Sequence, residues 1–142
     1  MTERTYGMIK PDAVADKVTG KIITMIEEAD FEIVAMKKTT FSKAEAAAFY
    51  DVHKEKPFFD ELVTFLTSGP VIALVLECDG AIAKWRELMG ALKPEDQADG
   101  TIRKLYAKNI GENAVHGSDA PETAKREIAQ IFPCLSCGCC CE

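Results

Sequence analysis

The chain contains few of the residues from which metal centres and nucleic-acid surfaces are usually built. Its only histidines in 142 residues are His53 and His116, and neither belongs to a His-Glu-x-x-His or Cys/His zinc spacing. Lysines and arginines number 17 against 23 aspartates and glutamates, which gives a formal net charge of -6. Such an acidic chain is not built to hold a nucleic-acid duplex through its overall field, so a phosphate-bearing ligand must be gathered by a local cluster of cations.

Long hydrophobic runs are also missing. Charges appear at Glu3 and Arg4, and the first dozen residues contain no apolar run of signal-peptide length. No segment approaches the roughly 18 consecutive apolar residues that a membrane-spanning helix requires. We therefore expect a cytoplasmic protein with no membrane partner and no requirement for nucleic acid.

The six cysteines are unevenly distributed. Cys78 ends an apolar run and is expected to be a buried small hydrophobe. The other five lie in the C-terminal stretch CLSCGCCCE, at positions 134, 137, 139, 140 and 141. This break in composition predicts a domain over residues 1–133 and a Cys-rich tail over 134–142. The tail is compatible with soft-metal binding, lipidation or simple oxidation, and we favour a passive, disordered segment.

Hydrophobic periodicity predicts a mixed α/β domain. A content of 47% hydrophobic residues suffices for a core without disulfides. Alternation predicts strands over 4–11 and 31–41, and an unbroken apolar run predicts a central strand over 70–78, buried on both faces. Helical spacing predicts helices over 16–30, 42–53, 57–69, 80–92 and 120–132. The order indicates an α/β (α+β), ferredoxin-like split βαβ sandwich, in which helices cover a small, mainly antiparallel sheet.

Two helix starts carry capping signals. Ser42 followed by Glu45 matches a capping box, and Asp119 followed by Pro121 and Glu122 predicts an N-cap for the last helix.

The irregular segment 93–117 is the best candidate for function, because so long a loop in a compact domain is usually functional or disordered. A short helix near 102–107 and a short strand at 114–116 are expected within it. It carries Arg103, whose planar fork of donors suits phosphate oxygens, together with Asn113 and His116. With Lys10 and Arg86 at neighbouring strand and helix ends, the pattern suggests a small anionic ligand.

Residue chemistry alone leaves several roles open. His116 fits a structural histidine bonded to backbone, or a general base or nucleophile oriented by Glu127 with Ser118 bridging the two. Tyr50 fits either the edge of the core or catalysis, and Lys10 fits a plain solvated charge. Phe58 follows a proline, where an exposed aromatic ring would offer a platform for a base.

Five segments together resemble the nucleoside diphosphate kinase family, bacterial type. NAVHGSDAPETAKREIAQIF is similar to its active-site signature, with the core Asn-x-x-His-Gly-Ser-Asp. ERTYGMIKPDAV resembles its opening strand, and HKEKPFFDELVTFLTSGPV, WRELMG and DGTIR match its middle and its phosphate-contacting loop. The resemblance spans residues 3–132 in the family's order, so it is far more specific than a single motif.

The resemblance implies transfer of the γ-phosphoryl from a nucleoside triphosphate such as ATP to a nucleoside diphosphate, by a ping-pong mechanism through phospho-His116. It implies that Glu127 and Ser118 orient His116, and that Phe58, Leu62 and Ile110 hold the base. The remaining phosphate and ribose contacts would come from Lys10, Tyr50, Arg86, the position of Leu92, Arg103 and Asn113. It also implies Mg²⁺ bridging the phosphates with few or no protein ligands, and a homo-oligomer, either a hexamer or a tetramer of dimers.

Two departures from the family pattern keep alternatives open. Leu92 stands where the family usually has a threonine whose hydroxyl contacts phosphate, and RKLYA replaces the usual Arg-Ala-Asp-Phe. A non-catalytic nucleotide-binding protein, motivated by Leu92, and a metal-handling protein, motivated by the cysteine tail, are the competing hypotheses. The presence of His116, Glu127 and Lys10 favours the kinase over both.

The Leu92 departure yields a direct prediction. Leucine cannot donate a hydrogen bond, and a bond to a charged group contributes about 1.5–3 kcal/mol, so binding or rate is weakened by one to two orders of magnitude. Leu92→Thr is expected to raise the steady-state rate of phosphoryl transfer from ATP to a second nucleoside diphosphate by up to that factor. Unchanged kinetics in the threonine variant would show that the missing hydroxyl does not limit the enzyme.

Overall fold

Four strands form one antiparallel sheet in the order β2-β3-β1-β4. The computed structural model describes residues 2–137. The strands are β1 (Thr2–Ile9), β2 (Glu32–Thr39), β3 (Val71–Asp79) and β4 (Val115–Gly117). As predicted, β3 is an inner strand, and its first six residues are buried.

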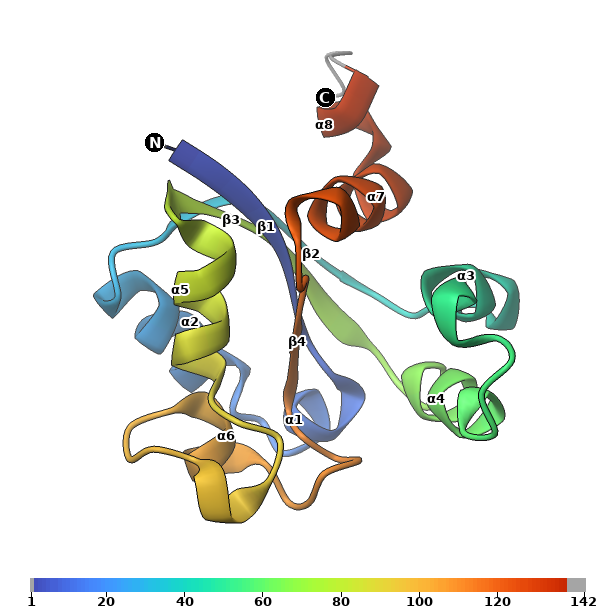
Figure 1. Ribbon diagram of the computed structural model, residues 1–142, viewed down its shortest axis with the longest axis horizontal. Helices are drawn as coiled ribbons and strands as arrows, with labels where there is room; N and C mark the ends of the chain where they lie inside the picture. The colour runs from blue at the N-terminus through green and yellow to red at the C-terminus, as the bar shows by residue number, and fades with distance from the viewer. Residues whose placement is uncertain (1, 138–142) are drawn as a thin grey trace.

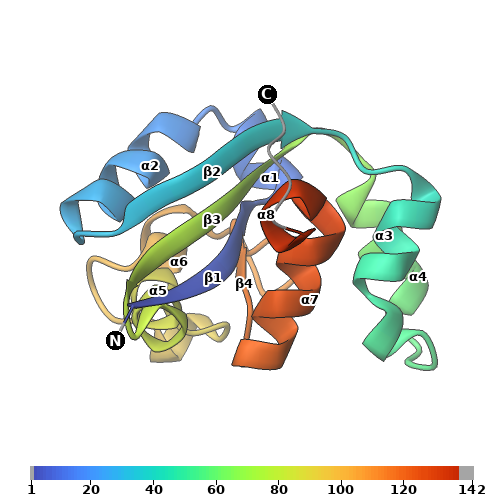
Figure 2. The same ribbon diagram turned by 90° about the horizontal axis from the view of Figure 1, so that it is seen from above.

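Helices cover both faces of this sheet, in agreement with the predicted split βαβ sandwich (Figure 1). One face is covered by α1 (Pro11–Ala15), α2 (Thr19–Glu28), α5 (Ala81–Met89) and α6 (Ile102–Tyr106). The other is covered by α3 (Lys43–Phe49), α4 (Phe59–Leu66) and α7 (Pro121–Ile131), which α8 (Pro133–Cys137) follows. Seen from above, α2 and the α3–α4 pair lie at opposite ends of the molecule (Figure 2).

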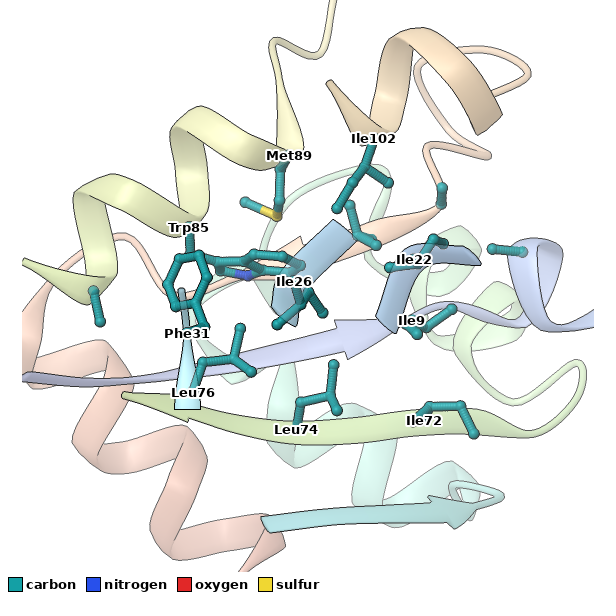
Figure 3. Close-up of a cluster of buried hydrophobic side chains, with 14 residues drawn as sticks. Ile9, Ile22, Ile26, Phe31, Ile72, Leu74, Leu76, Trp85, Met89 and Ile102 are labelled. Atoms are coloured by element: carbon teal, nitrogen blue, oxygen red, sulfur yellow. The ribbon is translucent and has the colours of Figure 1, made fainter. Parts of the chain in front are cut away.

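The alternation of β3 separates two hydrophobic cores. Ile72, Leu74 and Leu76 point into the cluster beneath α2 and α5, where Trp85 and Phe31 meet edge to face with ring centroids 6.2 Å apart (Figure 3). The intervening residues Val71, Ala73 and Val75 belong to the cluster beneath α3, α4 and α7. Both faces of β3 are therefore buried, as its unbroken apolar sequence predicts.

The structure confirms one of the expected helix caps and corrects three other expectations. The first strand ends at Ile9 because Pro11 opens the short helix α1, with Lys10 as its N-cap. The capping box of Ser42 and Glu45 is confirmed. The expected N-cap at Asp119 is wrong: Ala120 occupies that position in an extended conformation and no side chain caps α7. Cys78 is half-buried instead of buried.

The first residues of the predicted tail are helical. Residues 134–137 belong to α8, which follows α7 after a single residue, so they continue the helical layer. The remainder of the predicted tail, residues 138–142, lies outside the described residues. Within residues 2–137, no helix combines the length and the apolarity that crossing a membrane requires.

Two glycines let Trp85 pack flat against the edge of the sheet. Gly7 and Gly117 face each other across β1 and β4, and Met8 faces His116. A Cβ atom on Gly117 would lie 2.5 Å from Cδ1 of Trp85, a distance that real contacts do not reach. Trp85 also donates a hydrogen bond from Nε1 to the carbonyl of His116 at 3.1 Å. The indole therefore sets the position of the strand that carries His116.

We expect Gly117→Ala to destabilise the fold, because the added methyl must displace the buried Trp85. Overpacking of this kind costs about 1–3 kcal/mol, which corresponds to a melting temperature roughly 3–10 °C lower. The matched control is Gly20→Ala in α2, where nothing lies within 4 Å of the added Cβ. Its melting temperature should not fall, since alanine favours helix. Equal melting temperatures for the two variants would contradict this packing argument.

Candidate active site

A cavity of about 330 Å³ opens beside β4, between α7, α5 and the end of α3. The chain elements that meet there each contribute polar side chains. These include Tyr50, His53, Arg86, His116, Asp119, Thr123, Arg126 and Glu127. The cavity thus gathers four of the predicted site residues, Tyr50, Arg86, His116 and Glu127, from separate parts of the chain.

A buried carboxylate joins three of the predicted residues. Oε1 of Glu127 lies 3.1 Å from Nε2 of His116 and accepts a hydrogen bond from Oγ of Ser118 at 2.7 Å. The Glu127 side chain is 3% exposed and that of His116 is 19% exposed. Since an ionised carboxylate only accepts hydrogen bonds, Nε2 must carry the proton, which leaves the lone pair on Nδ1 available.

Aromatic rings fix the orientation of the imidazole. The ring of Phe49 meets that of His116 edge to face, with centroids 5.0 Å apart, and Tyr6 lies 6.0 Å away on centroids. Burial, followed by the charge of Glu127, raises the pKa of the Tyr6 hydroxyl well above its usual value. The same two causes raise the pKa of Tyr50 to about 12. Both phenols therefore stay neutral beside the carboxylate.

Lys10 and Asn113 are hydrogen-bonded to each other and are not part of the cavity lining. Nζ of Lys10 donates to Oδ1 of Asn113 at 2.9 Å, and Nδ2 of Asn113 donates to the carbonyl of Ile110 at 2.9 Å. Burial is the main cause that lowers the pKa of Lys10 to about 8; the charge of Arg103 also lowers it, and that of Asp12 opposes the shift. A phosphate group would supply the negative charge that this buried cation favours.

Arg103 holds the backbone together as well as offering donors to a ligand. Its guanidinium donates to three backbone carbonyls, those of Asn113 at 3.3 Å, Gly90 at 2.9 Å and Val115 at 2.9 Å. These bonds use three of the five N–H groups of an arginine, so two remain for a ligand. Burial and the charge of Arg86 lower its pKa to about 10. Arg103 thus joins α5, the loop and β4.

The residues expected to hold a base lie outside this cavity. Phe58 is 44% exposed at the start of α4, Ile110 is 53% exposed, and Leu62 is partly buried against the α3–α4 core. Leu92, 48% exposed, follows the end of α5. Aromatic rings connect the cavity to Phe58. The ring centroid of His53 lies 6.3 Å from that of Tyr50 and 5.8 Å from that of Phe58.

The sequence reasoning missed four polar residues of the cavity lining: His53, Asp119, Thr123 and Arg126. A signal for two of them was present. Thr123, Arg126 and Glu127 follow helical spacing of i, i+3 and i+4, so they share one face of α7. Arg126 lies 3.8 Å from Oε2 of Glu127 and donates to the carbonyl of Phe49 at 3.4 Å. Asp119, expected to cap α7, lines the cavity instead.

Comparison with known proteins identifies a family. The model of the nucleoside diphosphate kinase family matches residues 3–136. Nucleoside diphosphate kinase from Phenylobacterium zucineum (strain HLK1) is 58% identical over 132 residues, 93% of this chain and 95% of its own length. That of Rhodopseudomonas palustris (strain HaA2) is 59% identical over 130 residues, 92% of this chain and 93% of the relative.

Solved structures agree with the sequence relatives. An orthorhombic crystal form of Aquifex aeolicus nucleoside diphosphate kinase superposes with a TM-score of 0.92 at 42% identity, covering 96% of this chain and 99% of that one. The Halobacterium salinarum nucleoside diphosphate kinase in complex with CDP has a TM-score of 0.88 at 42% identity, covering 93% and 88%. The chain therefore belongs to the nucleoside diphosphate kinase family and is a phosphotransferase that acts on nucleotides.

Proposed function

We propose that the chain transfers the γ-phosphoryl of a nucleoside triphosphate, such as ATP, to a nucleoside diphosphate through phospho-His116. The observation that carries this proposal is the bond between Nε2 of His116 and the buried carboxylate of Glu127. It leaves Nδ1 as the nucleophile in the cavity, with Arg86 lining the same space. Ser118 keeps Glu127 in place.

In the first half-reaction, the Nδ1 lone pair of His116 attacks the γ-phosphorus of the triphosphate. A P–N bond forms while the bond from the γ-phosphorus to the bridging oxygen breaks, and the nucleoside diphosphate leaves with that electron pair. The imidazole becomes positively charged as the bond forms, and the adjacent Glu127 carboxylate stabilises this charge. In the second half-reaction, a terminal phosphate oxygen of another diphosphate attacks the same phosphorus, the P–N bond breaks, and its electron pair returns to Nδ1, so that His116 is neutral again.

Phosphoryl transfer needs in-line positioning and stabilisation of charge more than covalent chemistry from the protein. We assign these tasks to Lys10, Arg86, the two remaining N–H groups of Arg103, and Asn113. Tyr50 would position the phosphates from the cavity wall. Phe58 would stack on the base, with Leu62 and Ile110 beside it, and such stacking accepts every base because each has a π-face. Leu92 would lie at the phosphate position without donating a bond.

We propose that Mg²⁺ enters on the nucleotide phosphates. The donor set fits this arrangement, because no group of three His, Cys, Asp or Glu side chains in residues 2–137 is arranged to hold a metal. Asp119 is the cavity-lining carboxylate whose oxygens are free to approach such an ion through water, whereas Glu127 is engaged by His116 and Ser118. The ion would supply positive charge to the phosphates.

We also propose a homo-oligomer, either a hexamer or a tetramer of dimers. In the described part of the chain, β2 is an edge strand, and Met36 on it is 52% exposed. Edge strands offer unpaired backbone groups to another chain.

We further assign the protein to the cytoplasm, on the ground that its substrates are nucleotides. We also propose that residues 1–133 form the kinase domain and residues 134–142 a tail.

A phosphoenzyme assay tests this mechanism. Mixing the protein with γ-³²P-labelled ATP and Mg²⁺ should give one acid-labile phosphate per chain, which a nucleoside diphosphate then discharges. His116→Ala should abolish the label, whereas the matched control His53→Gln, at the other histidine, should remain labelled. Nucleotide binding without any label in the intact protein would favour the non-catalytic alternative that Leu92 motivates.

The pKa of Lys10 predicts a pH dependence. In the free enzyme Lys10 carries its charge below a pH of about 8 and loses it above, so kcat/KM should fall as the pH rises through about 8. Bound phosphate favours the charged form, so the corresponding limb of kcat should lie at higher pH. In Lys10→Gln the value at neutral pH should be lower and this limb should disappear. A limb that persists in Lys10→Gln would assign it to another group.

A further inference from the structure

The backbone immediately before His116 adopts a strained turn. Ala114 has a φ of 73°, a region that residues other than glycine rarely adopt. The N–H of Val115 bonds to the carbonyl of Asn113 at 2.8 Å, which closes a three-residue γ-turn around Ala114. Such conformations persist only where the surrounding structure holds them. This turn separates Asn113 from His116, two residues that the proposed mechanism places on the phosphates.

The segment that begins α1 holds both peptide groups of the strained residue. The carbonyl of Ala114 accepts a bond from the N–H of Lys10 at 2.8 Å, and its N–H donates to Oδ2 of Asp12 at 3.1 Å. The first bond belongs to the backbone, so almost any sequence can make it. The second depends on the Asp12 side chain, which reaches across 102 positions of sequence.

In the described part of the chain, Asp12 forms no ion pair that would explain its burial. Its residue is 6% exposed, and its Oδ1 has no hydrogen-bond partner in the described part of the chain. The neighbouring cation, Lys10, gives its bond to Asn113 instead. Burial raises the pKa of this carboxyl, and the N–H of Ala114 is the largest of the contacts that oppose the shift. The carboxylate therefore interacts most specifically with the turn.

We propose that Asp12 is a positioning residue for phosphoryl transfer, acting by holding the γ-turn at Ala114. Ala114 is fully buried, so loss of Asp12 would leave its N–H without a partner and let the turn relax toward negative φ. That relaxation displaces Asn113 on one side and His116 on the other. The inference rests on the proposed function, because its readout is the phosphorylation of His116.

The test is a double-mutant cycle that measures the single-turnover rate of His116 phosphorylation at saturating ATP. Asp12→Ala should lower this rate about 10–100-fold, the range that corresponds to the strain of a non-glycine residue held at positive φ, because the turn can then relax. Asp12→Asn keeps an acceptor and should retain most of the activity. In an Ala114→Gly background, where positive φ is unstrained, Asp12→Ala should cost less than about fivefold. That rescue is not expected from a general loss of stability.

The matched control is Asp16→Ala on the same segment, where the carboxylate pairs with the exposed Lys108 at 3.2 Å. Its phosphorylation rate should equal that of the unmodified chain, and melting temperatures of all variants are measured in parallel. A wild-type rate in Asp12→Ala, or the same loss in both backgrounds, overturns the inference. If Asp12→Ala does not fold, a rate for Asp12→Asn as low as that of His116→Ala overturns it as well. An intact chain that takes no label contradicts the proposed function itself.

Discussion

The architecture of the site depends on one buried carboxylate oxygen, Oε1 of Glu127, which is shared between His116 and Ser118. Because an ionised carboxylate can only accept, it sets the proton on Nε2 of His116 and aims Nδ1 at the cavity. The fold supplies the two partners separately, His116 from β4 and Glu127 from α7. Trp85 and Phe49 then restrict the strand and the ring, so the imidazole has one orientation.

The chain is acidic overall, yet the positive charges of Lys10 and Arg103 lie close together, where we propose that the phosphates bind. Burial lowers the pKa of Lys10 and of Arg103, which means that both cations are destabilised while no anion is present. A polyphosphate relieves that cost on binding. The same residues are structural as well, since Arg103 bonds to the carbonyls on both sides of Ala114 and Lys10 bonds to Asn113. Lys10 and Arg103 therefore both stabilise the loop before His116 and offer positive charge to the phosphates.

Local patterns predicted most of the fold, and through-space contacts explain what they missed. The capping box at Ser42 and the buried strand over 71–76 follow from neighbouring residues, and both are present. The short helix α1 was missed because five residues give too little periodicity to recognise. Two hydrogen bonds link separate segments: Arg103 donates to the carbonyl of Gly90, and the N–H of Ala114 donates to Asp12. No local sequence pattern could reveal either bond. The site residues themselves were named by family resemblance more than by periodicity.

The protonation pattern of His116 can be measured by long-range ¹H–¹⁵N correlation NMR on protein labelled at histidine, before and after phosphorylation. We expect a neutral ring with the proton on Nε2 and, after reaction with ATP, a phosphate on Nδ1. Replacing Glu127 with glutamine should weaken this preference between the two nitrogens. A proton on Nδ1 in the resting protein, or a phosphate on Nε2 after the reaction, would show that Glu127 does not set the nucleophilic nitrogen of His116.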